Sequence, residues 1–199
     1  MLSRPFACLL ALVLATRLAQ SQIQASHVQN LPVRTAASRD SAAVLAASLE
    51  TILNDSEVCC GKNSSLGDIV QGADPAFLKD LAAKLQGRHL LEDGRPITVT
   101  AEYLPANSID SDRIIASVMK NQALLMQWNS HLYVLDGVLF NEEFASAGND
   151  GGGSQRYNAI LKLSLIDVRF SDARRHATFN RATDDWKSVQ GLLMVSVAR

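Results

Sequence analysis

Residues 121–138 read NQALLMQWNSHLYVLDGV, and this stretch indicates the fold class of the chain. Two apolar runs, 123–128 and 132–140, lie on either side of a short polar break. Both runs are rich in Leu, Val and aromatic residues, which is typical of buried β-strands. Runs of the same character follow at 159–170, 176–180 and 191–198. The sequence therefore predicts that strands dominate the second half of the chain and pair antiparallel.

The first half has the apolar spacing of helices instead. Helical spacing and polar caps predict helices at 41–54 and 111–120, and a short helix that starts near Cys60 or at the polar residues 63–65 and runs to 70. A further helix is predicted at 74–87, where Pro near the start and Gly at the end are the usual helix boundaries. Between the helices at 74–87 and 111–120, alternation at 97–101 predicts one strand. Helices first and antiparallel strands later describe an α+β domain, which we place at residues 40–199.

Composition fits an ordinary soluble domain. The chain has 199 residues, with 19 Lys and Arg against 20 Asp and Glu, and 47% of its residues are hydrophobic. A chain of this size can bury a core without disulfides or a structural metal. Because nucleic-acid binders usually carry a basic excess, the near-neutral charge argues against a nucleic-acid partner.

The N-terminus has the pattern of a secretory signal. Arg4 precedes an apolar stretch at 7–15, and Ala19 and Ser21 are the small residues that cleavage before Gln22 would require. We therefore predict a signal peptide over residues 1–21, a secreted or periplasmic location and no stable membrane insertion after cleavage. An uncleaved membrane anchor is the alternative. The polar residues 22–39 are predicted to form a flexible lead-in.

The cysteines that would remain after signal cleavage suggest a catalytic role for one of them. Cys8 leaves with the predicted signal, so the adjacent pair Cys59 and Cys60 remains. Neighbouring cysteines cannot form an ordinary disulfide, and two thiolates alone do not make a tetrahedral zinc site. Burial as small hydrophobes and an intermolecular bridge are the structural alternatives. We predict no metal and no cofactor, and we consider an exported thiol a candidate nucleophile.

Four residues could together catalyse acyl transfer. Cys60 is the preferred nucleophile and His131 could serve as its base and acid, while Asp167 could fix the tautomer of the imidazole ring. Asn54 could donate its amide to a developing oxyanion. Cys59 is an alternative nucleophile, and two other carboxylates could replace Asp167, namely Asp136 and Asp172.

At these residues the sequence resembles the papain-like cysteine peptidases, and most closely the bacterial double-glycine (bacteriocin-processing) peptidases and their secreted relatives. The resemblance covers roughly residues 48–199 and is strongest at 121–138, where an apolar strand leads to His131 and a hydrophobic strand with Gly137 follows. Asp167, in the sequence LIDVR, has the place of the orienting residue.

The resemblance implies a cysteine on an N-terminal helix packed against an antiparallel sheet. It further implies an exported peptidase that cleaves a peptide or protein substrate through a thioester. Because a fold does not determine activity, the rival hypothesis is a noncatalytic protein-binding module on the same fold.

Overall fold

The fold was analysed in a computed structural model of the chain, which describes residues 22–53, 65–72, 78–91, 93–145 and 155–198. The predicted signal peptide at 1–21 lies outside the described residues. So do three of the candidate site residues, Asn54, Cys59 and Cys60.

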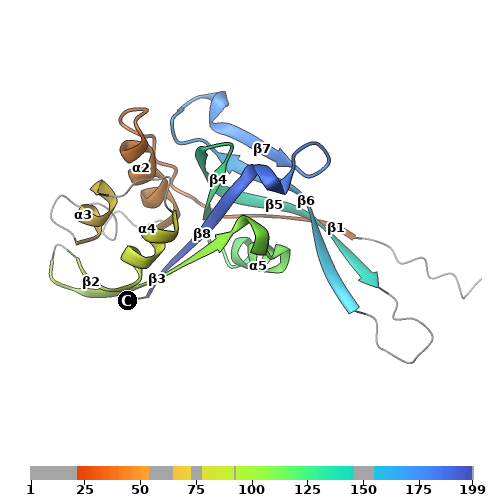
Figure 1. Ribbon diagram of the computed structural model, residues 1–199, viewed down its shortest axis with the longest axis horizontal. Coiled ribbons are helices and arrows are strands. Elements are labelled where there is room, and N and C mark those ends of the chain that lie inside the picture. Colours follow the sequence, from red (N-terminus) through yellow and green to blue (C-terminus); the bar gives the residue numbers. More distant parts are fainter. Residues whose placement is uncertain (1–21, 54–64, 73–77, 92, 146–154, 199) are drawn as a thin grey trace, which may run out of the picture.

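One antiparallel sheet of eight strands forms the centre of the molecule (Figure 1). Its order is β2-β3-β8-β4-β5-β6-β7, and β1 pairs separately with β5. The last strand, β8, lies between β3 and β4 and so joins the β2–β3 hairpin to the β4–β7 meander. The strands are β1 (Gln22–His27), β2 (Gly87–Leu90), β3 (Pro96–Pro105), β4 (Leu124–Trp128), β5 (His131–Ala145), β6 (Gln155–Ile166), β7 (His176–Asn180) and β8 (Val189–Ala198).

The long strand β5 has two neighbours along the same edge. Its first residues, His131 to Leu135, pair with β4, whereas Gly137 to Glu142 pair with β1. On its other edge, the pairing with β6 shifts register between Leu135 and Gly137, so Asp136 is an extra residue in the strand. Such a bulge bends a strand and increases its twist, and here it marks the point where β1 replaces β4.

The helices pack at different parts of the sheet. Figure 1 shows α3 and α4 near β2 and β3. The helix α2 packs against β4, β5 and β8, and α5 packs against β1, β5 and β6. Asp40 caps the start of α2, where its carboxylate accepts from the backbone N–H of Ala43 at 2.9 Å, and Asp110 caps α5. The α-helices are α2 (Ser41–Leu53), α3 (Ser65–Gln71), α4 (Leu78–Leu85) and α5 (Ser111–Met119); short 3₁₀ turns are η1 (Ala106–Ser108), η2 (Ala173–Arg175) and η3 (Trp186–Ser188).

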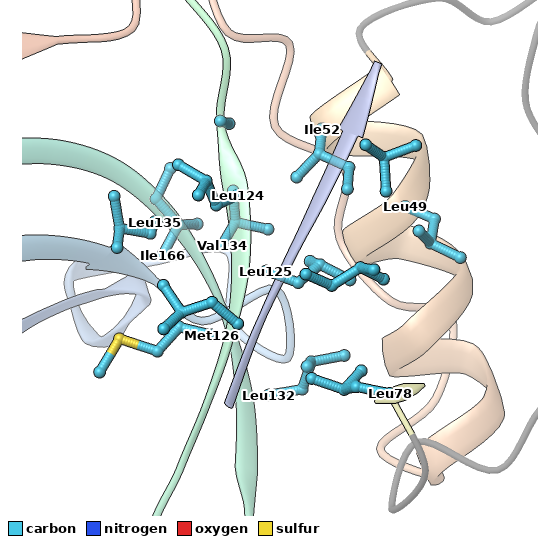
Figure 2. Close-up of a cluster of buried hydrophobic side chains, with 14 of the residues drawn as sticks. Leu49, Ile52, Leu78, Leu124, Leu125, Met126, Leu132, Val134, Leu135 and Ile166 are labelled. Atoms are coloured by element: carbon cyan, nitrogen blue, oxygen red, sulfur yellow. The ribbon is translucent and has the colours of Figure 1, made fainter. Parts of the chain in front are cut away.

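The first three residues of β4 lie in the core. Leu124, Leu125 and Met126 are each completely buried, and because successive side chains of a strand point to opposite faces, both faces of β4 are covered. In Figure 2, Leu125 points toward Leu49 and Ile52 of α2, whereas Leu124 and Met126 lie on the other side of the strand. This central strand therefore lies within the core, and its short hairpin with β5 is anchored there.

The α+β prediction is confirmed, because the structure combines helices with an antiparallel sheet, 30% and 43% of its residues respectively. The papain-like arrangement within this class stays a prediction. The predicted helices and strands correspond to observed elements with shifted ends, but β1 and β2 were missed. Residues 22–27, expected in a flexible lead-in, form β1 because they pair with the distant strand β5.

Candidate functional site

His131 is exposed at the first position of β5, directly after a tight turn. Asn129 and Ser130 connect β4 to β5 with positive φ angles of 49° and 62°, the combination that a two-residue hairpin requires. The backbone N–H of Asn129 donates to the carbonyl oxygen of Ser188 at 3.1 Å, which ties the turn to η3. The imidazole is therefore presented from a fixed backbone.

Asp167 lies directly after β6, and only 4% of its surface is exposed. Its backbone N–H donates to the carbonyl oxygen of Arg175 at 2.7 Å, which closes the β6–β7 connection. Both carboxylate oxygens accept from Arg169, Oδ1 from Nε at 2.8 Å and Oδ2 from Nη2 at 2.5 Å. Oδ1 also accepts from the backbone N–H of Arg169 at 3.0 Å. Asp167 is thus the bidentate partner of a guanidinium group.

Arg169 also reaches His131. Its Nη1 lies 3.0 Å from Nδ1 of the imidazole. Because a guanidinium group only donates hydrogen bonds, Nδ1 must be the acceptor, and a neutral His131 ring then carries its proton on Nε2. The structure therefore places His131 and Asp167 on either side of Arg169, which contacts both of them in place of the direct contact that a catalytic triad requires.

Sequence reasoning missed Arg169, although a local signal was present. In three places an Asp is followed two residues later by Arg, and each time the carboxylate binds both the backbone N–H and the guanidinium group of that Arg. Side-chain oxygens of Asp commonly accept from the backbone two residues on, and Arg at that position adds the ion pair. The pairs are Asp93–Arg95, Asp167–Arg169 and Asp172–Arg174.

Several arginines lie around Phe170, next to the Asp167–Arg169 pair. The guanidinium carbons of Arg39, Arg169 and Arg174 lie 5.3, 5.9 and 4.7 Å from the centre of the Phe170 ring. These distances are within the range of cation–π attraction. Arg175 fixes the backbone here, because it donates to the Phe170 carbonyl oxygen at 2.9 Å and to Thr35 Oγ1 at 2.7 Å. We call these four arginines and Phe170 the arginine cluster.

The charges in the cluster are mutually stabilised. Hydrogen bonding and the charge of Asp167 raise the pKa of Arg169, against the effect of its burial. In the same way, hydrogen bonds from Arg174 hold the pKa of Asp172 below its usual value. Among the residues that the structure describes, Arg169 and Arg174 have carboxylate partners in this cluster, and Arg39 and Arg175 add positive charge beside them.

Aromatic side chains extend the site beyond His131. The ring centroids of Trp128 and Tyr133 are 5.8 Å apart, and those of Trp128 and Phe179 are 5.5 Å apart. Trp186 packs against Phe179 in a tilted arrangement, with a centroid distance of 4.8 Å. Burial and the Asp167 carboxylate raise the pKa of Tyr133, although Arg169 opposes them, so its hydroxyl stays protonated at neutral pH.

Within the described ranges, no three His, Cys, Asp or Glu side chains are grouped closely enough to hold a metal ion. Across the same residues, no helix has the length and apolar character needed to span a bilayer.

The structure does not describe the segment that holds three of the candidate site residues. They are the proposed nucleophile Cys60, its alternative Cys59 and the oxyanion donor Asn54.

Comparison with known proteins identified no relative. No protein-family model matches the chain, and neither the curated proteins nor the solved structures contain a significant match.

Proposed function

We propose that this protein is a noncatalytic binding module that recognises an acidic segment of a protein partner through the arginine cluster. One observation carries the proposal, namely the position of Arg169 between Asp167 and His131. A base that activates a thiol must accept its proton, usually while a carboxylate holds the other ring nitrogen. Here a cation holds that nitrogen, so the geometry favours binding over proton transfer.

The chemistry of the cluster suits carboxylates. The planar guanidinium group of arginine binds carboxylates in a bidentate geometry. Arginine and aromatic side chains are also enriched at protein interfaces. Phe170 is half-buried and supplies an apolar centre, while Arg39 and Arg174 are exposed beside it. The chain as a whole carries a formal charge of −1, so the positive charge is local and selects a short acidic segment.

Peptide cleavage by Cys60 and His131 is the competing proposal. It rests on the sequence pattern, since the two cysteines and Asn54 lie outside the described residues. It would require Arg169 to release Nδ1 of His131 during the reaction. The state of the His131 ring therefore distinguishes the two proposals.

We expect a fluorescent peptide of Asp, Glu and Gly to bind the full chain more tightly than the same peptide with Asn and Gln. The double variant Arg39→Gln/Arg174→Gln should weaken this binding several-fold, because it removes two exposed charges from the cluster. Binding should also weaken as salt is added, since exposed charges are screened. Fluorescence anisotropy titrations measure both effects.

The matched control is Arg95→Gln/Arg113→Gln, which removes the same charge from two other surface ion pairs, with Asp93 and Glu102. The control should keep the affinity of the unmodified chain. Equal loss in both double variants, or equal binding of the acidic and amide peptides, would contradict the proposal. Tighter binding of a short DNA duplex than of the acidic peptide would also contradict it, because the partner would then be a nucleic acid.

A further inference from the structure

The strand β1 pairs with β5 along one edge only, and its backbone shows which groups face the other edge. In an antiparallel pair, the N–H and C=O groups of every second residue point toward the neighbouring strand, and those of the residues in between point away. The N–H of Val28 donates to the carbonyl oxygen of Asp136 on β5 at 2.8 Å, so the even-numbered residues of β1 face β5. The backbone groups of Ile23, Ala25 and His27 therefore point to the free edge.

A side chain closes one end of this edge. Gln29 is the next odd-numbered residue, and its backbone N–H donates to Oδ1 of Asn121, which follows α5. The carbonyl oxygen of Gln29 accepts from Nδ2 of the same Asn121 at 3.4 Å, and Gln29 itself donates to the carbonyl oxygen of His27 at 3.2 Å. In the part of the chain that the structure describes, nothing comparable binds the outward backbone groups of Ile23 and Ala25.

The strand β1 also has none of the features that usually protect an exposed edge. Its sequence, QIQASH, contains no Asp, Glu, Lys, Arg or Pro, and its pairing with β5 has no bulge. Charges, prolines and bulges keep edge strands from pairing with other chains. A Cβ atom added to Gly137 of β5 would lie 2.2 Å from Nδ1 of His27, so this imidazole leans toward β5 and leaves the edge open. Ile23 and Ala25 are exposed, Ile23 at 65%.

We propose that the free edge of β1 pairs antiparallel with the same edge of a second copy of the chain, with the two-fold axis at Ala25. In this register, Ala25 lies opposite Ala25 of the second copy, and each Ile23 lies opposite His27 of the other copy. Every outward N–H of one strand then meets an outward C=O of the other. The interface is formed by the same residues on both copies, as in other two-fold dimers, and the sheet continues across it.

The side chains along this edge favour an identical partner. Because β1 contains no Asp, Glu, Lys or Arg, two copies do not repel each other, and a charged segment finds no ion-pair partner here. The small Ala25 lies at the axis, and the exposed Ile23 gains a contact with the imidazole of His27 of the second copy. On the other face of the sheet, Gln24 lies opposite Ser26 of the second copy, which is a polar pair. Since few residues take part, we expect a weak dimer that dissociates on dilution.

Analytical ultracentrifugation of the full chain over a range of concentrations tests this inference. We expect a monomer–dimer equilibrium in the unmodified chain. Ala25→Lys should raise the dissociation constant about fivefold or more, because two like charges would lie directly opposite each other, and Ala25→Glu should do the same. An equimolar mixture of these two variants should recover the dimer, since opposite charges then meet at the axis.

Ala25→Pro tests the backbone pairing itself. The N–H of Ala25 does not face β5, so proline is compatible with the edge strand. It removes two hydrogen bonds between the copies, and the dissociation constant should rise about tenfold or more. The control Leu90→Lys adds the same charge at an exposed apolar residue of β2, at the other end of the sheet, and should leave the equilibrium unchanged.

An unmodified chain that stays monomeric up to about 100 µM would overturn the inference. So would a dimer that Ala25→Lys or Ala25→Pro leaves unchanged, or a mixture of the two charged variants that associates no better than either variant alone. A monomer whose β1 amides gain hydrogen-exchange protection only when the acidic peptide is added would also overturn it, because a partner protein would then supply the pairing strand. Since the dimer forms without a peptide, its failure and the failure of the proposed function are distinguishable.

Discussion

Arg169→Met should lower the free energy of unfolding by about 3 kcal/mol, because it leaves the Asp167 carboxylate buried without its cation. Asp167 and Arg169 have 6% and 21% of their side chains exposed. Breaking a buried ion pair by removing one partner is costly, and the partial exposure of Arg169 places the loss at the lower end of the usual range. Urea denaturation of the full chain measures this loss.

The neighbouring pair Asp172–Arg174 provides the matched control. It has the same sequence spacing and similar hydrogen bonds, but its side chains are 52% and 66% exposed. Arg174→Met should therefore change stability little, since exposed ion pairs contribute little. Adding Asp167→Asn to Arg169→Met should recover part of the lost stability, as a double-mutant cycle would show. Equal losses in Arg169→Met and Arg174→Met would contradict the importance of burial at Asp167.

Leu125→Ala should destabilise the protein by about 2–5 kcal/mol, because it opens a cavity at the centre of the core. Leu125 is completely buried on β4, where Figure 2 shows it pointing toward α2. The cavity would lie between the sheet and the helix, so both the lost apolar burial and the lost packing contribute. Denaturation followed by circular dichroism measures the change.

Leu90→Ala is the control for this substitution, because it deletes the same atoms from a side chain of β2 that is 56% exposed. Its expected cost is about 0.5 kcal/mol or less. Similar costs at the two positions would mean that the space between α2 and the sheet is not filled as described.

Elements with a dense or periodic apolar pattern could be predicted from the sequence. The strand around Leu125 begins with three buried apolar residues, the end of the strand around Leu163 is rich in buried Leu and Ile, and α5 shows a single apolar face. In contrast, β1 has the sequence QIQASH, in which only Ile23 is a large apolar residue, and that residue is 65% exposed. The stability of β1 as a strand comes from its pairing with β5, more than a hundred residues away, which no local pattern reveals.

The candidate site was predicted in part. The sequence suggested that Asp167 orients His131, and in the structure the two side chains share a contact with Arg169, while their catalytic roles stay a prediction. The sequence could not reveal that Arg169 is the partner of both side chains, because the partner of a carboxylate depends on which side chain reaches it in the fold. Arg169 is two residues from Asp167, so it reaches the carboxylate through a local turn, whereas His131 must approach across the sheet.

Nitrogen NMR of the His131 imidazole, recorded on the intact chain at about pH 8, where an ordinary imidazole is neutral, tests the contact on which the proposed function depends. We expect Nε2 to carry the proton and Nδ1 to show the shift of an acceptor, and Arg169→Met should change the Nδ1 signal. The opposite result is a proton on Nδ1, or a charged ring that loses its charge in Cys60→Ala. Either finding would contradict the binding module and would support a thiolate–imidazolium pair.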